Sequence, residues 1–239
     1  METRSTYRLN LRQRIYRFIK AIMDFVIALT ALIVLLPLFL VVAVAIKIDS
    51  PGPVFFVQKR IGQNGKLFNC IKFRSMVCDA QPYVATFEYK NVQSYITKVG
   101  ARIRRFSIDE LPQLFNVLAF QMSLIGFRPT IANETELDDA RKNLDVYQIR
   151  PGISGWAQVN GRDFLAANPK KKAEYDAYYL KHLSLWLDIK IFFMTIVKVL
   201  KKDGVMEGLA ERSTERENGV KIDADTAVTL NCGHDWKVN

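Results

Sequence analysis

Residues 21–46 read AIMDFVIALTALIVLLPLFLVVAVAI, an apolar run interrupted by one charge, Asp24, and one proline, Pro37. At about 1.5 Å per residue, a straight helix of this length would reach about 39 Å, more than the roughly 30 Å thickness of the hydrocarbon layer. A cleaved secretory signal does not fit, because the run is too long and no small-residue cleavage site follows it. The run therefore predicts a membrane-embedded helix.

Basic residues lie on both sides of this run, and the positive-inside rule favours the cytoplasm for both flanks. They are Arg4, Arg8, Arg12, Arg14, Arg17 and Lys20 before it, and Lys47, Lys59, Arg60, Lys66, Lys72 and Arg74 after it. A helix that enters the membrane, breaks at Pro37 and leaves by the same face satisfies both flanks, since proline removes a hydrogen bond and clashes with the preceding turn. A single span with a tolerated proline kink is the alternative. The residues alone leave both arrangements open.

The composition allows one compact unit besides the membrane segment. The chain has 239 residues, 49% of them hydrophobic, and a formal net charge of +10. Such a basic surplus suits an anionic membrane face, a phosphorylated ligand or nucleic acid. Cys70, Cys78 and Cys232 match no paired framework or metal motif, so we expect reduced thiols in a cytosolic setting and no zinc site.

The middle of the chain predicts a small mixed domain. Apolar runs on either side of Asn64-Gly65 indicate a β-hairpin over residues 54–73. Further along we expect a loop or short helices over 79–98, a helix after Pro112, a polar helix over about 131–146 and a glycine-arginine loop over 150–162.

Residues 170–202 combine aromatic and aliphatic side chains with lysines and are bounded by lysine clusters. This composition is typical of helices that lie in the headgroup zone, and Asp188 and Lys190 argue against a span. A core helix with an amphipathic stripe is the alternative.

An adjacent acid pair stands out in RFSIDELPQLFNV, residues 105–117. The spacing from Ser107 to Glu110 is that of a helix capping box, which explains those two residues and leaves Asp109 unexplained. Cations near Asp109 are expected to keep its carboxylate ionised, as a nucleophile on phosphorus or as a ligand, with Glu110, of a divalent ion that bridges phosphate oxygens.

The chain also carries more cationic side chains than a fold of this size needs, many of them near turn-forming residues. Arginines and glycine amides suit a diphosphate, and no Walker or GxGxxG loop is present. The cations are Lys72, Arg74, Arg102, Arg104, Arg105, Arg128, Arg150 and Arg162.

Five motifs, which follow the proline-containing apolar segment, together resemble the monotopic phosphoglycosyl transferases, the bacterial polyprenyl-phosphate sugar-1-phosphate transferases. The resemblance covers about residues 10–202, in the family's order. The motifs are SPGPVFFVQKRIG from residue 50, KFRSM from 72, SIDELPQLFNVL from 107, MSLIGFRP from 122 and RPGISGWAQVNGRD from 150.

The resemblance implies an α/β, mostly helical fold: a re-entrant membrane helix, interfacial amphipathic helices and a small cytoplasmic catalytic cap that contains the hairpin. It also implies the reaction of a UDP-sugar with polyprenyl phosphate to give polyprenyl-diphospho-sugar and UMP, with Mg²⁺. In the family the aspartate of the acid pair, here Asp109, is the nucleophile of a ping-pong reaction. Glu110 is expected to bind metal or handle a proton, and Arg104 to lie near the phosphate.

These expectations divide the chain into four parts: a basic lead-in over 1–20, a re-entrant helix over 21–50 broken at Pro37, a catalytic domain over 51–202 and an acidic tail over 203–239. We expect a minimal family member, without further N-terminal membrane helices, on the cytoplasmic face of the bacterial inner membrane. Its expected partners are UDP-sugar, polyprenyl phosphate and membrane lipids, and no nucleic acid. A homodimer is left open.

Two positions depart from the family pattern. Phe127 stands where a proline is usual, so we expect the turn that shapes the nucleotide pocket to differ. Leu36 stands where a serine usually precedes Pro37. The rival hypothesis is a non-enzymatic scaffold that binds anionic lipid at the membrane surface.

Overall fold

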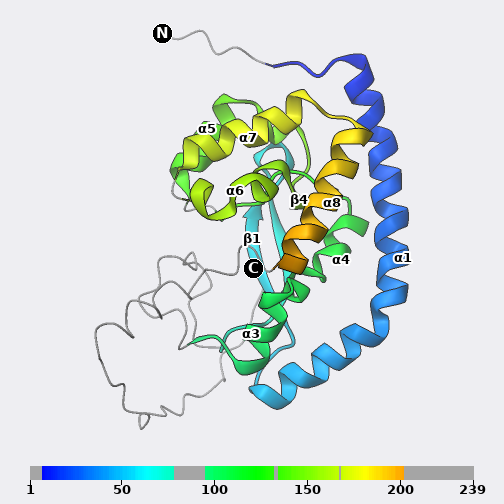
Figure 1. Ribbon diagram of the computed structural model, residues 1–239, viewed down its shortest axis with the longest axis vertical. Helices are drawn as coiled ribbons and strands as arrows, with labels where there is room; N and C mark the ends of the chain where they lie inside the picture. The colour runs from blue at the N-terminus through cyan, green and yellow to red at the C-terminus, as the bar shows by residue number, and fades with distance from the viewer. Residues whose placement is uncertain (1–6, 78–94, 132–133, 167, 202–239) are drawn as a thin grey trace.

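The computed structural model describes residues 7–77, 95–131, 134–166 and 168–201 (Figure 1). Helix α1, Leu11–Asp49, is 39 residues long. It begins at a capping box in which Asn10 and Gln13 exchange side-chain-to-backbone hydrogen bonds, and it ends at Ser50. By its length and composition, α1 is able to cross a membrane, and only 17% of its most apolar window is buried.

Pro37 lies inside α1 and does not end it. The helix turns in its lighter-blue second half (Figure 1), yet the residues on both sides of Pro37 belong to one helix. The predicted break is therefore a bend. The proline removes one hydrogen bond, and the long apolar sequence around it stays helical. The predicted boundary between the lead-in 1–20 and the membrane segment also falls inside α1, which begins at Leu11.

The predicted hairpin is confirmed. Strands β1, Phe55–Ile61, and β2, Leu67–Phe73, pair antiparallel, with Phe55 opposite Phe73. The turn between them, η1 (Gln63–Gly65), places Asn64 at φ 57° and Gly65 at φ 71°. Asparagine and glycine are the residues that adopt this left-handed backbone most readily.

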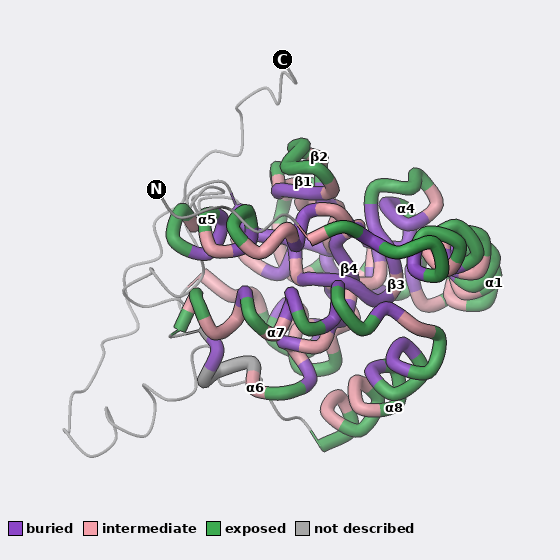
Figure 2. The backbone as a smooth tube through the Cα atoms, turned by 90° about the horizontal axis from the view of Figure 1, so that it is seen from above, coloured by how far each residue is buried: buried purple, intermediate pink, exposed green. Residues whose placement is uncertain are grey.

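Two short strands form the centre of the domain. After α3 (Lys98–Arg105), η3 (Ile108–Glu110) and α4 (Gln113–Leu118), the chain forms β3, Ser123–Ile125. Strand β3 pairs in parallel with β4, Gly152–Ser154, and the connection contains α5 (Thr135–Asn143) and η4 (Val146–Gln148). The polar helix predicted over 131–146 is thus confirmed in its central part. Figure 2 shows β3 and β4 buried between the β1–β2 hairpin and α7.

The segment 150–162 is not the predicted loop. It forms β4 and most of α6, Trp156–Ala166. Its glycines allow a close approach of backbones, because a Cβ on Gly152 would lie 2.1 Å from the Gly126 nitrogen and one on Gly155 would lie 1.9 Å from the Gly126 oxygen. These glycines are packing residues of the parallel pair.

Two helices complete the described chain, as predicted for residues 170–202. They are α7, Pro169–Lys181, and α8, Leu185–Lys201. Helix α8 lies beside the first half of α1 (Figure 1), where the Asp188 carboxylate accepts from Tyr16 at 2.7 Å and pairs with Lys20 at 2.6 Å. Its outer face exposes large apolar side chains: Leu185, Trp186, Ile189, Phe192, Phe193, Ile196, Val197 and Leu200.

The core confirms a mostly helical α/β fold. One apolar cluster joins β3, η4, α7 and α8, with Val146, Leu180 and Ile191 fully buried. Two smaller clusters join α1 to the hairpin and to α4 and α3. The loop predicted over 79–98 falls mostly outside the described residues, as do the acidic tail and two of the three cysteines. Cys70 is a free, buried thiol.

Candidate functional site

The acid pair lies in a tight turn between α3 and α4. Ser107 adopts a left-handed conformation at φ 54° and makes no side-chain capping bond, and the turn closes through Glu110 N–H donating to the Ser107 carbonyl at 3.2 Å. The capping-box interpretation of Ser107 and Glu110 is therefore wrong. Their spacing fits, but the Glu110 side chain is drawn to cations on neighbouring elements.

Glu110 pairs with two cations that the hairpin and the end of β3 supply. Lys72 Nζ, on β2, lies 2.9 Å from Glu110 Oε1, and Arg128 Nη2 lies 2.7 Å from the same oxygen. Arg128 Nη1 also donates to Glu110 Oε2 at 3.3 Å, so the guanidinium contacts both oxygens. The Glu110 side chain is only 12% exposed. The carboxylate is fixed in position and charge-compensated.

Asp109 differs from its neighbour. It is 9% exposed, and among the described residues its carboxylate makes no side-chain hydrogen bond or ion pair. Burial and the adjacent Glu110 raise the pKa of Asp109, while Lys72, Arg104 and Arg128 oppose that rise. Burial thus outweighs the nearby cations in setting the direction of the Asp109 pKa shift.

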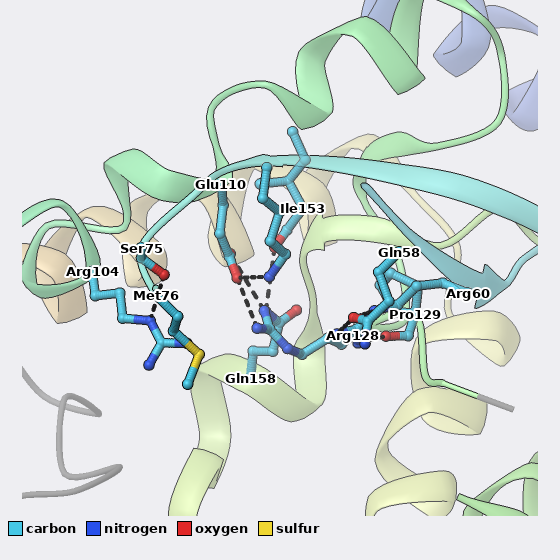
Figure 3. Close-up of polar contacts among 11 residues, drawn as sticks. Gln58, Arg60, Ser75, Met76, Arg104, Glu110, Arg128, Pro129, Ile153 and Gln158 are labelled. Atoms are coloured by element: carbon cyan, nitrogen blue, oxygen red, sulfur yellow. Dashed lines mark hydrogen bonds and ion pairs between the residues drawn. The ribbon is translucent and has the colours of Figure 1, made fainter. Parts of the chain in front are cut away.

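Arg104 approaches the pair from α3. Its Nε donates to Ser75 Oγ at 2.9 Å and its Nη2 contacts Met76 Sδ at 3.6 Å. In the view of Figure 3, Glu110 lies between Arg104 on one side and Arg128 on the other. Arg104 also contributes to the electrostatics at Asp109. The structure thus brings three of the predicted substrate-binding cations to the acid pair, Lys72, Arg104 and Arg128. The other three are Arg74, Arg150 and Arg162.

Arg74 makes structural hydrogen bonds within the fold. Its guanidinium donates to the Pro51 carbonyl at 2.7 Å, to the Ser50 carbonyl at 2.7 Å and to Ser50 Oγ at 2.9 Å. It thereby fastens the chain just beyond α1 to the end of β2. These contacts do not support the predicted substrate-binding role.

Arg150 and Arg162 are not brought to the acid pair by any described contact. The Arg150 guanidinium lies over the Phe120 ring, 5.2 Å from its centroid, and lines a cavity beside α1. Burial lowers the pKa of Arg150 and Asp24 opposes the shift. Arg162 lies in α6, and its side chain is outside the described residues.

The pair fits the predicted metal ion only in part. In the described part of the chain, no group of three or more His, Cys, Asp or Glu side chains is arranged to hold a metal. Asp109 and Glu110 supply two carboxylates, and Glu110 is already paired with cations. Mg²⁺ often takes one or two carboxylates and completes its shell with substrate phosphates and water. The residues present therefore suit a metal that arrives with a diphosphate.

A buried ion pair behind Arg128 could not be predicted from the sequence. Arg141 Nη2 and Nε donate to Asp176 Oδ2 at 2.6 and 2.9 Å, and Arg141 Nη1 donates to the Arg128 carbonyl at 3.0 Å. Both side chains of this ion pair are at most 1% exposed. No local motif marks them, because they come from different helices, α5 and α7.

Phe127 lies beside the same ion pair. Its side chain is 1% exposed, packs edge-on against Tyr147 at 5.3 Å and lies under the Arg141 guanidinium at 4.9 Å. The departure from the usual proline therefore places a ring in the core, below the backbone that leads to Arg128.

Comparisons with known proteins give one family match and several similar relatives. The bacterial sugar transferase family matches residues 15–202. The chain is 45% identical over 191 residues to a UDP-N-acetylgalactosamine-undecaprenyl-phosphate N-acetylgalactosaminephosphotransferase of Aeromonas hydrophila, an alignment of 78% of this chain and 44% of that relative.

Two relatives with a different sugar in their names are similarly close. Both are UDP-glucose:undecaprenyl-phosphate glucose-1-phosphate transferases. The one of Xanthomonas campestris pv. campestris is 44% identical over 76% of this chain and 38% of its own length. The one of Escherichia coli K12 is 40% identical over 76% of this chain and 40% of its own length. The chain spans less than half the length of these relatives.

The family match includes most of α1, the hairpin, the acid pair and all five motifs, and it extends over most of the chain. The chain belongs to the bacterial sugar transferase family.

Proposed function

We propose that the chain transfers a sugar-1-phosphate from a UDP-sugar to polyprenyl (undecaprenyl) phosphate, giving polyprenyl-diphospho-sugar and UMP. Relatives with this activity in their names support the proposal, and the reaction is expected to start the assembly of a surface glycan. Relatives of similar identity differ in the sugar, so the proposal leaves the sugar open.

The observation that carries the proposal is the contrast between two adjacent carboxylates. Glu110 is paired with Lys72 and Arg128, which contact both of its oxygens. Asp109 is nearly buried with no described partner, and a desolvated carboxylate is a stronger nucleophile than a hydrated one. Asp109 is therefore the group that attacks phosphorus.

In the first step an Asp109 carboxylate oxygen attacks the phosphorus that bears the sugar. A P–O bond forms to Asp109 as the bond to the bridging oxygen breaks, and UMP leaves with the electron pair. Arg104 and Arg128 lie where they can bind the phosphate oxygens and stabilise the charge that develops on them.

In the second step a phosphate oxygen of the lipid acceptor attacks the phosphorus of the aspartyl phosphate. The new P–O bond forms the diphosphate of the product, and the Asp109 carboxylate is released unchanged. The order of events is ping-pong, since UMP leaves before the acceptor reacts.

Mg²⁺ is part of the proposal as an ion that would be held by the acid pair together with the diphosphate oxygens. When bound, it would neutralise phosphate charge. Lys72 and Arg128 supply positive charge from the protein, and through Glu110 they hold the turn that carries Asp109 in place.

The proposal places the chain on the cytoplasmic face of the bacterial inner membrane. Helix α1 would be re-entrant, with its bend at Pro37 inside the bilayer and both basic flanks in the cytoplasm. The exposed apolar face of α8 would lie in the interface beside α1, and residues 51–202 would form the catalytic domain. The acceptor would then reach Asp109 along the membrane plane.

Incubation with UDP-sugar alone tests the chemistry. The expected results are release of UMP without acceptor and a peptide containing Asp109 that gains the mass of a sugar phosphate. Separate incubations with UDP-glucose, UDP-galactose and UDP-N-acetylgalactosamine identify the donor. Asp109→Asn should abolish both signals, while Asp139→Asn, on the exposed face of α5, should keep them.

A non-enzymatic membrane scaffold is the rival, and it makes the opposite prediction. It has no need of the acid pair, so Asp109→Asn and Glu110→Gln would leave its function intact. UMP release that requires the acceptor, or a sugar phosphate attached to another side chain, would contradict the covalent route.

A further inference from the structure

A second cationic site lies beside α1, apart from the acid pair. It is a cavity of about 380 Å³ between the first half of α1 and the β3–β4 centre. Four cations line it, Arg14, Arg17, Lys20 and Arg150, with one carboxylate, Asp24. None of Lys72, Arg104, Glu110 and Arg128 lines this cavity.

Two of the four cations are already engaged by the protein. Lys20 Nζ pairs with Asp188 at 2.6 Å and with Asp24 at 3.4 Å. Arg14 Nε donates to the Leu9 carbonyl at 3.2 Å. The single carboxylate of the cavity is thus already paired with Lys20, and positive charge remains in excess around the cavity.

Among the described residues, Arg17 and Arg150 form no ion pair, and Asp24 acts on Arg150 only as a nearby charge. Both are partly buried, and neither donates a hydrogen bond to any described residue. The Arg150 guanidinium carbon lies over the Phe120 ring, 5.2 Å from the ring centroid. Two guanidinium groups partly removed from water are unfavourable when the one carboxylate that lines the cavity, Asp24, already pairs with Lys20. An anion between them would remove that cost, and phosphate matches their geometry.

The cavity is also apolar on part of its wall, and it lies at a particular place on α1. Phe18, Ile149 and Leu183 line it with the cations. Its α1 residues, from Arg14 to Asp24, include the point where the basic lead-in meets the apolar run at residue 21. At that depth a membrane-bound chain meets lipid headgroups, with phosphate beside the first carbons of the acyl region.

We propose that this cavity binds the phosphate of an anionic membrane phospholipid between Arg17 and Arg150, with the glycerol end of the lipid against the apolar wall. The bound lipid would fasten the first half of α1 to the β3–β4 centre at headgroup level. The site is separate from the transfer chemistry at Asp109.

Lipid retention by the full chain tests the site without any activity measurement. The protein is placed in nanodiscs of phosphatidylcholine, with or without phosphatidylglycerol, and the lipids that remain bound after release are counted by native mass spectrometry. Wild-type protein should retain phosphatidylglycerol in preference to phosphatidylcholine. Arg17→Gln and Arg150→Gln should each lower that retention by about ten-fold, as the loss of a charge-assisted hydrogen bond implies.

Matched variants separate this site from general surface charge. Arg12→Gln removes an exposed cation of α1 that does not line the cavity, and it should retain the lipid as wild type does. Arg17→Lys and Arg150→Lys keep the charge but lose the paired donors, and should give intermediate retention. These variants also serve if a glutamine variant fails to fold.

Two results would overturn the proposal. Equal retention of phosphatidylglycerol and phosphatidylcholine by the unaltered protein would overturn it, even if the variants retain less lipid. Displacement of phosphatidylglycerol by an equal concentration of inorganic phosphate would identify a site for the free ion in place of the lipid. Because no step involves UMP, failure here leaves the proposed transferase activity untouched, and failure of the transferase proposal leaves this site untouched.

Discussion

Arg128 Nη2 lies 2.7 Å from Glu110 Oε1, and this contact joins the end of β3 to the turn that carries the acid pair. It occupies the carboxylate of Glu110 and leaves that of Asp109 without a described partner. Two adjacent residues of the same chemistry thereby receive different tasks. In the proposed reaction, Glu110 positions the turn and its cations, and Asp109 is the nucleophile.

Glu110→Gln is predicted to lower UMP release by about 100-fold or more, a loss typical of a positioned charged group in an active site. The amide would leave Lys72 and Arg128 without their counter-charge, and the turn would lose its anchor. The measurement is single-turnover UMP release from UDP-sugar. A variant that retains half of the wild-type rate would show that the ion pairs do not position the nucleophile. Asp139→Asn is the control.

The first half-reaction is predicted to fail as the pH falls through the raised pKa of Asp109, because only the carboxylate attacks phosphorus. Lys72 lowers that pKa, so Lys72→Gln should move the acid limb of the UMP-release profile to higher pH. Lys66→Gln, an exposed lysine just after the hairpin turn, should leave it in place. An acid limb at the same pH in both variants would contradict the electrostatic role of Lys72.

The same pKa shift predicts a stability effect with a definite sign. Between the unfolded and the folded pKa of Asp109 the native state binds more protons, so native stability falls as the pH rises through this window. Asp109→Asn removes that penalty. The variant should therefore be more stable than wild type at pH 7, with a difference that shrinks towards pH 4. Thermal unfolding in detergent at both pH values measures it, and a less stable variant at pH 7 would contradict burial as the main cause.

Local chemistry explains which elements could be predicted from the sequence. The hairpin follows from Asn64-Gly65, because few other residues tolerate the backbone that this turn requires. The acid pair could be found from its motif, SIDELPQLFNVL. Helix α8 could be predicted because lysines alternate with aromatic side chains over a stretch that is too long for a strand.

The partners of charged groups could not be predicted, because they depend on elements distant in the sequence. Arg74 and Arg128 look alike as arginines near turns, yet one fastens the end of α1 and the other binds Glu110. Arg150 belongs to the cavity beside α1. The buried pair of Arg141 and Asp176 also forms only when α5 packs on α7.

Ser107→Gly is predicted to keep activity and to be neutral or more stable by up to about 1 kcal/mol. A non-glycine residue at φ 54° carries a cost of roughly 1 to 2 kcal/mol, which glycine does not incur, although glycine adds entropy to the unfolded chain. Ser107→Val should be strongly destabilising, because a branched side chain is rarely tolerated there. If glycine and valine behave alike, the left-handed turn is not what positions the acid pair.

Arg141→Met is predicted to destabilise the protein by about 3 to 5 kcal/mol, because it leaves the buried carboxylate of Asp176 without a partner. The double variant Arg141→Met with Asp176→Leu should recover most of that loss, since it removes both charges. Lys142→Gln, an exposed neighbour on α5, is the control and should change little. Unfolding in detergent gives the stabilities. A double variant no more stable than the single one would contradict the cost of the unpaired carboxylate.

The last prediction concerns the arrangement of α1 in the membrane. Single cysteines at Arg12 and Lys59, both exposed on the basic flanks of α1, are introduced after replacement of the three native cysteines. A re-entrant helix places both in the cytoplasm, so a membrane-impermeant maleimide should label neither in spheroplasts and both after lysis.

Pro37→Leu restores the hydrogen bond that the proline removes and straightens a helix long enough to span the bilayer. In that variant one flank should become accessible to the maleimide from outside. Activity should also be lost if the catalytic domain moves away from its lipid substrate. Labelling of one flank from outside in the unaltered protein would mean that the bend at Pro37 is only a kink in an ordinary span.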